Sequence, residues 1–308
     1  MYARDFRPKR SRGRTIVSIV GAVLTAALIL GSVGWYLYRL PYSPPGIVPL
    51  ETYVDIPSGS SARKVGEVLE EEGVIRKAEI FLVVLEAQGR AEQIKSGTYY
   101  FASPESLSTV INRVTTANYD LPTTRMTFLE GQANYQYAAQ LAREFEFVSE
   151  SRFRTLAKPY EGYLFPDTYF IPRRSTAREI IEIMRNNFEQ QTKSLQPQIT
   201  ESSYTLDEIV TMASLVESEA GSADLETKRR VAGILWERLE RGMPLQADAV
   251  FSYIYQSHLP RVLYRHLEVD SPYNVYKNTG LPPGPIGNPG LDSIKAVLDP
   301  IEGESLYY

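Results

Sequence analysis

Two glutamates stand close together near the C-terminal end of a segment with a strong helical pattern. Thr205 and Glu208 have the spacing of a capping box at its start, apolar residues recur every three or four positions, and Gly221 follows its end. Because each helical residue turns the chain by about 100°, Glu217 and Glu219 flank the apolar stripe from opposite sides. A carboxyl group at such an edge can be partly desolvated, which keeps it protonated near neutral pH as a general acid. The spacing does not choose between the two glutamates, and a solvated helix edge is the alternative for both.

Other familiar kinds of catalytic centre find little support in the residue types. The chain has no cysteine, which excludes a disulfide framework, a thiolate metal site and a cysteine nucleophile. Its two histidines, His258 and His266, have no third metal ligand close by in the sequence, so we predict no metal and no cofactor. Ser61 and Lys64 match the Ser-x-x-Lys pattern of penicillin-binding enzymes, but the accompanying Lys-Thr-Gly and Ser-Asp-Asn patterns are missing from the sequence.

Length and composition indicate a folded protein with more than one part. Of 308 residues, 43% are hydrophobic and 23% are charged, which is too apolar for a disordered chain. At roughly 150 residues per domain, this length predicts two domains, or one large domain with an appendage. The first 50 residues carry seven basic side chains and one acidic one, so the remainder is strongly acidic although the net charge is only -4. An acidic body argues against nucleic acid as a partner.

The segment 15–38 has the properties of a membrane-spanning helix. It carries no charged residue and, at about 1.5 Å per residue, is long enough to cross a hydrocarbon core of about 30 Å. A cleaved signal peptide is the alternative, but its apolar core is usually only about 7–15 residues long. Six basic residues precede the segment and Arg39 follows it, so the positive-inside rule places the N-terminus in the cytoplasm. We therefore predict a basic cytoplasmic tail at 1–14, a single-pass anchor in the cell membrane, a linker at 39–50 and an extracytoplasmic body.

Two further regions make up the predicted body. Residues 52–56 and 98–101 read as strands, and two helical patterns lie between them. This order of strand, helix, helix and strand resembles that of LysM-type glycan-binding modules, and a small spacer domain is the alternative. We place the LysM-like module at 51–114, a connector at 115–126 and a mixed α+β catalytic domain at 127–308. The predicted fold class of the body is α+β.

Four segments of the chain resemble one known family, and they follow one another in that family's order. They are Glu161-Gly162-Tyr163-Leu164-Phe165-Pro166-Asp167-Thr168-Tyr169, Ala213 to Glu219, Leu245-Gln246-Ala247-Asp248, and Ser271 to Tyr276 together with Gly280 to Ile286. The family is that of the MltG (YceG-like) endolytic murein transglycosylases, and the resemblance extends over nearly the whole chain. Members usually continue beyond the position of Tyr308, so the resemblance implies a catalytic domain that lacks a further strand, a hairpin and a tail.

The resemblance also implies a site and a reaction. The first glutamate of the Val-Glu-x-Glu helix, Glu217, is then the catalytic acid and base. It protonates the glycosidic oxygen and takes a proton from the 6-hydroxyl of N-acetylmuramic acid, which attacks its own anomeric carbon to form a 1,6-anhydro sugar. Amide, carboxylate and phenol side chains suit the hydroxyl and acetamido groups of such a substrate. Those expected to contact the sugars are Glu161, Asp167, Glu219, Gln246, Asp248, Asn274 and Tyr276.

The implied substrate is a peptidoglycan glycan strand, cut at internal bonds between N-acetylmuramic acid and N-acetylglucosamine. The implied protein partners are the peptidoglycan synthases of cell elongation. Two alternatives stay open: a non-catalytic envelope scaffold that binds glycan, and a hydrolytic muramidase in which Asp248 or Asp167 works with Glu217. The products distinguish the three, because only the transglycosylase leaves 1,6-anhydro ends.

Overall fold

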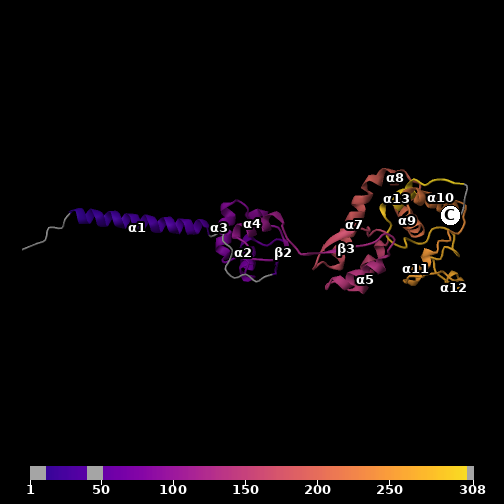
Figure 1. The fold of residues 1–308 in the computed structure, drawn as a ribbon, viewed down its shortest axis with the longest axis horizontal. Helices are drawn as coiled ribbons and strands as arrows, with labels where there is room; N and C mark the ends of the chain where they lie inside the picture. The colour runs from indigo at the N-terminus through magenta and orange to yellow at the C-terminus, as the bar shows by residue number, and fades with distance from the viewer. Residues whose placement is uncertain (1–11, 40–50, 304–308) are drawn as a thin grey trace, which may run out of the picture. The chain divides into compact units, whose positions relative to one another are not determined.

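The computed structural model describes residues 12–39 and 51–303 (Figure 1). The chain divides into two compact units, 1–122 and 123–308, and each is described by itself. The predicted connector at 115–126 contains the boundary between them.

A long helix, α1 (Arg12–Arg39), contains the segment predicted to span the membrane. Its side chains are described at 20–32 and at Trp35. Among the described residues, no helix combines the length and the hydropathy that crossing a membrane requires. Most of the predicted basic tail and linker lies outside the described residues, and so do the last five residues of the chain.

The first unit contains a small two-stranded sheet and three short helices. They are β1 (Thr52–Ile56), α2 (Ala62–Glu71), α3 (Ala78–Ala87), β2 (Gly97–Phe101) and α4 (Leu107–Thr116), with the 3-10 turn η2 (Ala91–Gln93) before β2. β1 and β2 pair antiparallel, with Val54 opposite Tyr99. Ser61 and Ser106 begin α2 and α4, because their hydroxyls accept backbone N–H groups of the first turn. The predicted order of strand, helix, helix and strand is confirmed, whereas the sequence analysis missed α4.

Apolar side chains from all of these strands and α-helices form the core of the first unit. They include Val54, Leu69, Phe81, Leu85, Tyr99 and Ile111. Val83 is 67% exposed, because its helix turns Phe81 and Leu85 inward. The guanidinium of Arg113 is buried and contacts Glu105 at 2.6 Å and the carbonyl oxygen of Tyr100 at 2.7 Å. Arg113 therefore ties α4 to β2.

The second unit combines another two-stranded sheet with a larger set of helices (Figure 1). Its strands are β3 (Thr123–Thr127) and β4 (Thr168–Pro172), and its helices are α5 (Asn134–Glu144), α6 (Glu150–Ala157), η3 (Lys158–Tyr160), α7 (Ala177–Thr192), η4 (Lys193–Leu195), α8 (Gln196–Glu201), α9 (Leu206–Ala220), α10 (Leu225–Glu240), α11 (Ala249–Tyr255), α12 (Tyr264–Leu267) and α13 (Leu291–Leu298). β3 and β4 pair antiparallel and share a core with α5, α6 and α7. This mixture of helices and small sheets confirms the predicted α+β class.

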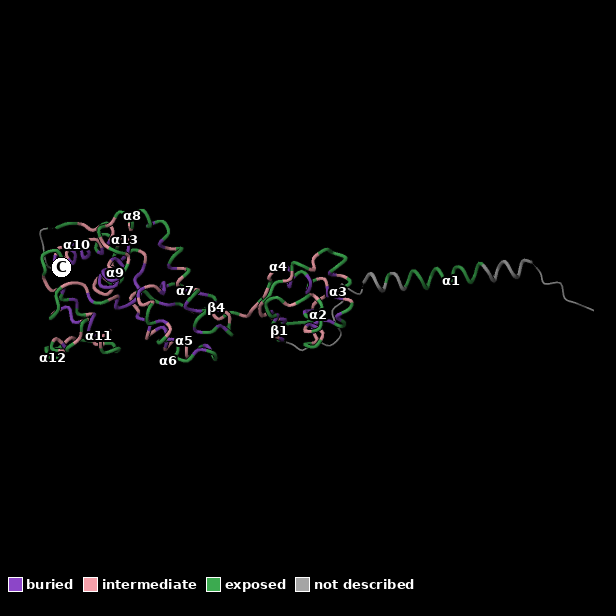
Figure 2. Tube along the Cα trace, turned by 180° about the vertical axis from the view of Figure 1, so that it is seen from behind, coloured by how far each residue is buried: buried purple, intermediate pink, exposed green. Residues whose placement is uncertain are grey.

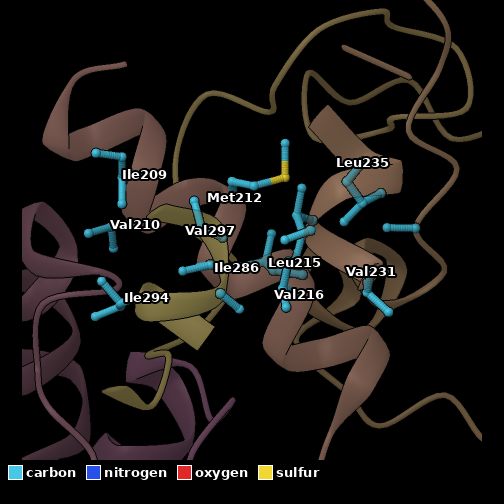
Figure 3. Close-up of a cluster of buried hydrophobic side chains, with 14 of the residues drawn as sticks. Ile209, Val210, Met212, Leu215, Val216, Val231, Leu235, Ile286, Ile294 and Val297 are labelled. Carbon is cyan, nitrogen blue, oxygen red and sulfur yellow. The ribbon is translucent and has the colours of Figure 1, made fainter. Parts of the chain in front are cut away.

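The second core of this unit surrounds α9, which packs against α10 and α13 (Figure 3). Every residue from Ile209 to Glu217 is buried, and Figure 2 shows the helix in the colour of buried residues. The predicted capping box is confirmed: the N–H of Thr205 donates to Glu208 Oε2 at 2.8 Å, and the N–H of Glu208 donates to Thr205 Oγ1 at 3.3 Å. The next helix, α10, begins after Asp224, whose side chain accepts the backbone N–H of Thr227.

Candidate active site

Glu217 is buried where α9 meets α10 and α13. Its side chain and that of Lys228 are each 3% exposed. The Lys228 Nζ lies 3.1 Å from Oε2 and 3.2 Å from Oε1 of Glu217. The same Oε2 accepts the hydroxyl of Ser293 at 2.6 Å and the backbone N–H of Gly290 at 3.1 Å. The carboxylate therefore ties α9 to α10 and to the start of α13.

These contacts fix the position of the Glu217 carboxylate, and its catalytic role stays a prediction. The sequence analysis placed this residue at the edge of the buried stripe, but α10 and α13 cover that side of α9. Both of its oxygens act as acceptors, and the ammonium of Lys228 balances its charge.

A carboxylate that the sequence analysis missed, Glu130, lies next to this ion pair. A Cβ atom added to Gly290 would lie 1.9 Å from Glu130 Oε1, so glycine leaves room for the carboxylate there. Partial burial and the negative charge of Glu217 raise the pKa of Glu130, and Lys228 opposes the shift. One feature of the sequence points to this group of Glu130, Glu217 and Lys228. Lys228 shares a helical face with Val231, and a lysine on a buried face requires a partner of opposite charge.

Glu219 lies on a different side of α9, half-buried, and its charge acts on Tyr276. The hydroxyl of Tyr276 donates to Asp248, and its ring packs against Phe251 with ring centroids 5.6 Å apart. Burial, the hydrogen bond to Asp248 and the charges of Asp248 and Glu219 raise the pKa of Tyr276, whereas Arg238 opposes the shift. The structure thus brings three of the predicted site residues together, with Asp248 exposed and the other two partly accessible.

Gln246 and Asn274 belong to the loops beside these residues. Gln246 is exposed, has a φ of 54°, and donates its backbone N–H to the carbonyl oxygen of Val275 at 3.2 Å. Asn274 is fully buried: its Nδ2 donates to two backbone carbonyl oxygens at 2.9 Å, and its Oδ1 accepts the N–H of Tyr276 at 3.1 Å. Both ends of this amide hold the loop that carries Tyr276. The structure therefore gives Asn274 a supporting role in place of the predicted sugar contact.

The two remaining predicted carboxylates have different surroundings. Glu161 accepts the backbone N–H of Asn134 at 2.9 Å and is hydrogen-bonded to Tyr253. Burial raises the pKa of Glu161 to about 7, although both hydrogen bonds oppose the shift. Asp167 serves the fold locally, since its oxygens accept the next backbone N–H at 2.7 Å and the Nδ2 of Asn187 at 3.0 Å. A carboxyl group that titrates near neutrality is typical of a functional site, so Glu161 stays a candidate.

Within residues 12–39 and 51–303, no three or more histidine or carboxylate side chains are grouped so that they could hold a metal ion. The buried His266 uses its Nδ1 to accept the N–H of Leu263 at 3.1 Å, and His258 is exposed after α11. The groups that gather around the accessible part of α9 are carboxylates and tyrosines.

The chain is similar to known proteins over most of its length. The model of the YceG-like family matches residues 54–308. A protein named endolytic murein transglycosylase from Bacillus subtilis (strain 168) is 31% identical over 91% of this chain and 84% of its own length. A protein of the same name from Streptococcus pneumoniae is 27% identical over 95% of this chain, which spans 61% of that relative. The crystal structure of a protein described as YceG-like from Listeria monocytogenes, 27% identical, matches with a TM-score of 0.55 over 83% of this chain and 92% of that one. The chain therefore belongs to the YceG-like family.

Proposed function

We propose that this protein is an endolytic peptidoglycan lytic transglycosylase that cuts glycan strands between N-acetylmuramic acid and N-acetylglucosamine. Family membership supports the class of enzyme, because relatives that align with most of this chain are named endolytic murein transglycosylases. The cluster of Glu219, Asp248 and Tyr276 supplies a carboxylate, a hydrogen-bonded acid and an aromatic ring for a sugar substrate. This cluster is the observation that carries the proposal.

One accessible carboxylate is enough for the proposed reaction. The carboxyl group gives its proton to the glycosidic oxygen as the bond from that oxygen to the muramic acid C1 breaks. The 6-hydroxyl of the same sugar then attacks C1, and its proton passes to the carboxylate as the 1,6-anhydro ring closes. The catalytic group ends the cycle in its starting form, and no water is consumed. A hydrolytic glycosidase needs a second carboxylate, because water must be activated or a covalent intermediate formed.

Glu219 fits this catalytic role better than Glu217 does. It is half-buried, whereas Glu217 is 4% exposed and forms a buried ion pair. Its charge also acts on Tyr276, which is hydrogen-bonded to Asp248, and these two residues come from two of the segments that carry the family resemblance. We therefore propose Glu219 as a candidate for proton exchange, beside Glu217, which the family resemblance implies for that role.

Digestion of peptidoglycan by the purified full chain, followed by mass spectrometry of the products, tests this proposal. We expect 1,6-anhydro ends from the wild type and a loss of about 10²- to 10⁴-fold in their formation by Glu219→Gln, with an unchanged circular dichroism spectrum. The matched variant Glu217→Gln combined with Lys228→Met removes both buried charges and is expected to keep activity.

The opposite pattern, with an active Glu219→Gln variant and an inactive but folded double variant, would return the catalytic role to Glu217. Reducing ends from the wild type would indicate a muramidase, for which Asp248 is the better placed second carboxylate, because Asp167 is held at the start of β4. Binding without new chain ends would indicate a scaffold.

The proposal includes a membrane anchor, a glycan-binding first unit and an extracytoplasmic body. In α1, the apolar side chains Leu28 and Leu30 are 73% and 72% exposed, which suits contact with lipid. The positive-inside pattern supports a cytoplasmic N-terminus, and the order of β1, α2, α3 and β2 supports the LysM-like assignment. Protease digestion of cells without their wall, before and after their membrane is permeabilised, tests the topology. While the membrane is intact, the protease reaches and cuts only an extracytoplasmic body. We also propose that the protein cuts nascent glycan strands beside peptidoglycan synthases.

A further inference from the structure

A second group of polar and aromatic side chains surrounds Glu161, apart from the residues assigned to proton exchange. The phenol of Tyr253 interacts with Glu161 and with Tyr273 and influences the pKa of both. The rings of the two tyrosines pack with their centroids 5.0 Å apart. The backbone N–H of Asn134 fixes the carboxyl group from another direction at 2.9 Å. This side chain is therefore oriented by groups from α5, from α11 and from the loop that follows α12.

Glu161 and Tyr273 both line an open pocket of about 460 Å³, which is in the range of small-ligand sites. Thr211 of α9 and the proline-rich segment 281–285 form other parts of its wall. This segment is held close to the body of the unit, because a Cβ atom on Gly162 would lie 2.6 Å from Pro285 and 2.8 Å from Val210. The pocket is thus walled by a stiff loop and by a buried helix.

The same elements connect this pocket with the Glu219 cluster. Tyr273 and Tyr276 belong to one loop, and they pack against Tyr253 and Phe251, which both belong to α11. Along α9, Thr211 in the pocket wall precedes Glu219 by two turns, or about 12 Å. A chain of sugar units that lies at Glu219 can therefore continue along α9 to Glu161.

We propose that Glu161, Tyr253 and Tyr273 form a second saccharide subsite, which holds an N-acetylated sugar of the glycan strand away from the bond that is cut. The inference rests on the proposed function, because it takes the same strand as the ligand of both sites. Phenol rings and hydroxyls suit the faces and hydroxyl groups of a sugar ring, and a neutral carboxyl group can donate to an acetamido oxygen. This subsite binds the strand and takes no part in the chemical step.

Binding at this subsite depends on the proton of Glu161. Since burial raises the pKa of Glu161 to about 7, the group changes between donor and acceptor near neutral pH. The other titratable or charged side chains that face it or line the same pocket are Tyr135, Tyr137, Lys158, Tyr163, Asp207, Glu208, Tyr253 and Tyr273. The ionised form has no proton to donate and is repelled by carbonyl oxygens, so the affinity for the strand falls as the pH rises.

The test compares KM and kcat for glycan strands of defined length at pH 6 and pH 8, using the full chain and counting 1,6-anhydro ends. For the wild type, KM is expected to rise by up to about tenfold from pH 6 to pH 8, following the fraction of neutral Glu161. Glu161→Gln keeps a neutral donor of the same size, so its KM is expected to stay within twofold over this range. Glu146→Gln, which changes an exposed carboxylate outside the pocket, serves as the matched control and keeps the wild-type behaviour.

Tyr253→Phe provides a second, smaller change that removes one hydroxyl and keeps the ring. Its KM at pH 6 is expected to rise several-fold while kcat stays within twofold. The subsite is ruled out if Glu161→Gln shows the pH dependence of the wild type, or if both variants change kcat and leave KM unaltered. Failure of the proposed function looks different, because the wild type itself would then produce no 1,6-anhydro ends.

Discussion

At the scale of single residues, the buried pair of Glu217 and Lys228 carries the sharpest stability prediction. Lys228→Met leaves the carboxylate of Glu217 in the core without its counter-charge, and breaking a buried pair in this way costs about 3–5 kcal/mol. The free energy of unfolding, measured by denaturant titration of the full chain in detergent, is expected to fall by that amount. The control is Lys295→Met, because Lys295 pairs with Asp292 at 3.0 Å on the surface and should lose less than about 1 kcal/mol. Equal losses in both variants would contradict the anchoring role.

Glu161 carries a prediction for stability as a function of pH. Its pKa is raised by burial from the ordinary 4.5 to about 7, so the folded protein binds its proton more tightly than the unfolded chain does. The stability that this proton contributes is fully present below pH 4.5 and is lost as the pH rises through 7. Between pH 5 and pH 8, the wild type should therefore lose roughly 2–3 kcal/mol more than Glu161→Gln. Parallel stability curves for the two proteins would show that Glu161 titrates normally in the fold.

The sequence predicted which residue types form the site better than it predicted what each one does. Asp248 and Tyr276, which belong to two segments with their own local patterns, are hydrogen-bonded, and the charge of Glu219 acts on Tyr276. The surroundings of Glu217 could not be derived locally, because its partner Ser293 lies 76 residues further along the chain. The role of Asn274 depends on a loop that closes around its amide, which no periodicity reveals.

At the scale of elements, α9 was predictable because its signals are local. The capping box and the terminal Gly221 fix its ends, and both depend only on neighbours along the chain. Its burial on all sides was not predictable, because α10 and α13 cover faces that carry polar residues. α4 was missed although Ser106 begins it as a cap, because its polar positions resemble a connector. Local chemistry thus defines where elements begin and end, and tertiary packing decides which of their faces are buried.

Gly162 provides a prediction about how α9 meets the proline-rich segment. Its φ of +86° is unfavourable for other residues, and a Cβ atom there would lie 2.6 Å from Pro285 and 2.8 Å from Val210. Gly162→Ala combines backbone strain with overpacking and should cost about 3 kcal/mol of unfolding free energy. Gly242→Ala is the matched control, since its φ is also positive, at +65°, but no atom lies within 4 Å of the added Cβ. It should cost only about 1–2 kcal/mol, measured in the same thermal or denaturant unfolding experiment.

At the scale of the whole molecule, the two units have separate hydrophobic cores. The core of the first unit draws on β1, α2, α3, β2 and α4, and the cores of the second unit draw on residues after Pro122. The polar contacts of Arg113 also stay within the first unit. Each unit therefore meets the requirement for independent folding, which is a core that closes within its own stretch of chain.

The fragment 51–122 is therefore expected to fold alone, with a cooperative thermal transition and dispersed amide resonances in NMR spectra. Arg113→Met should lower its melting temperature by at least several degrees, because Glu105 is left partly buried without its counter-charge. Arg63→Met changes an exposed arginine of the same fragment and serves as the control. Sedimentation with insoluble peptidoglycan then tests the LysM-like assignment on the same fragment. A folded fragment that stays in the supernatant would favour the spacer alternative. A fragment that sediments with peptidoglycan would show that the first unit binds glycan without the α9 site.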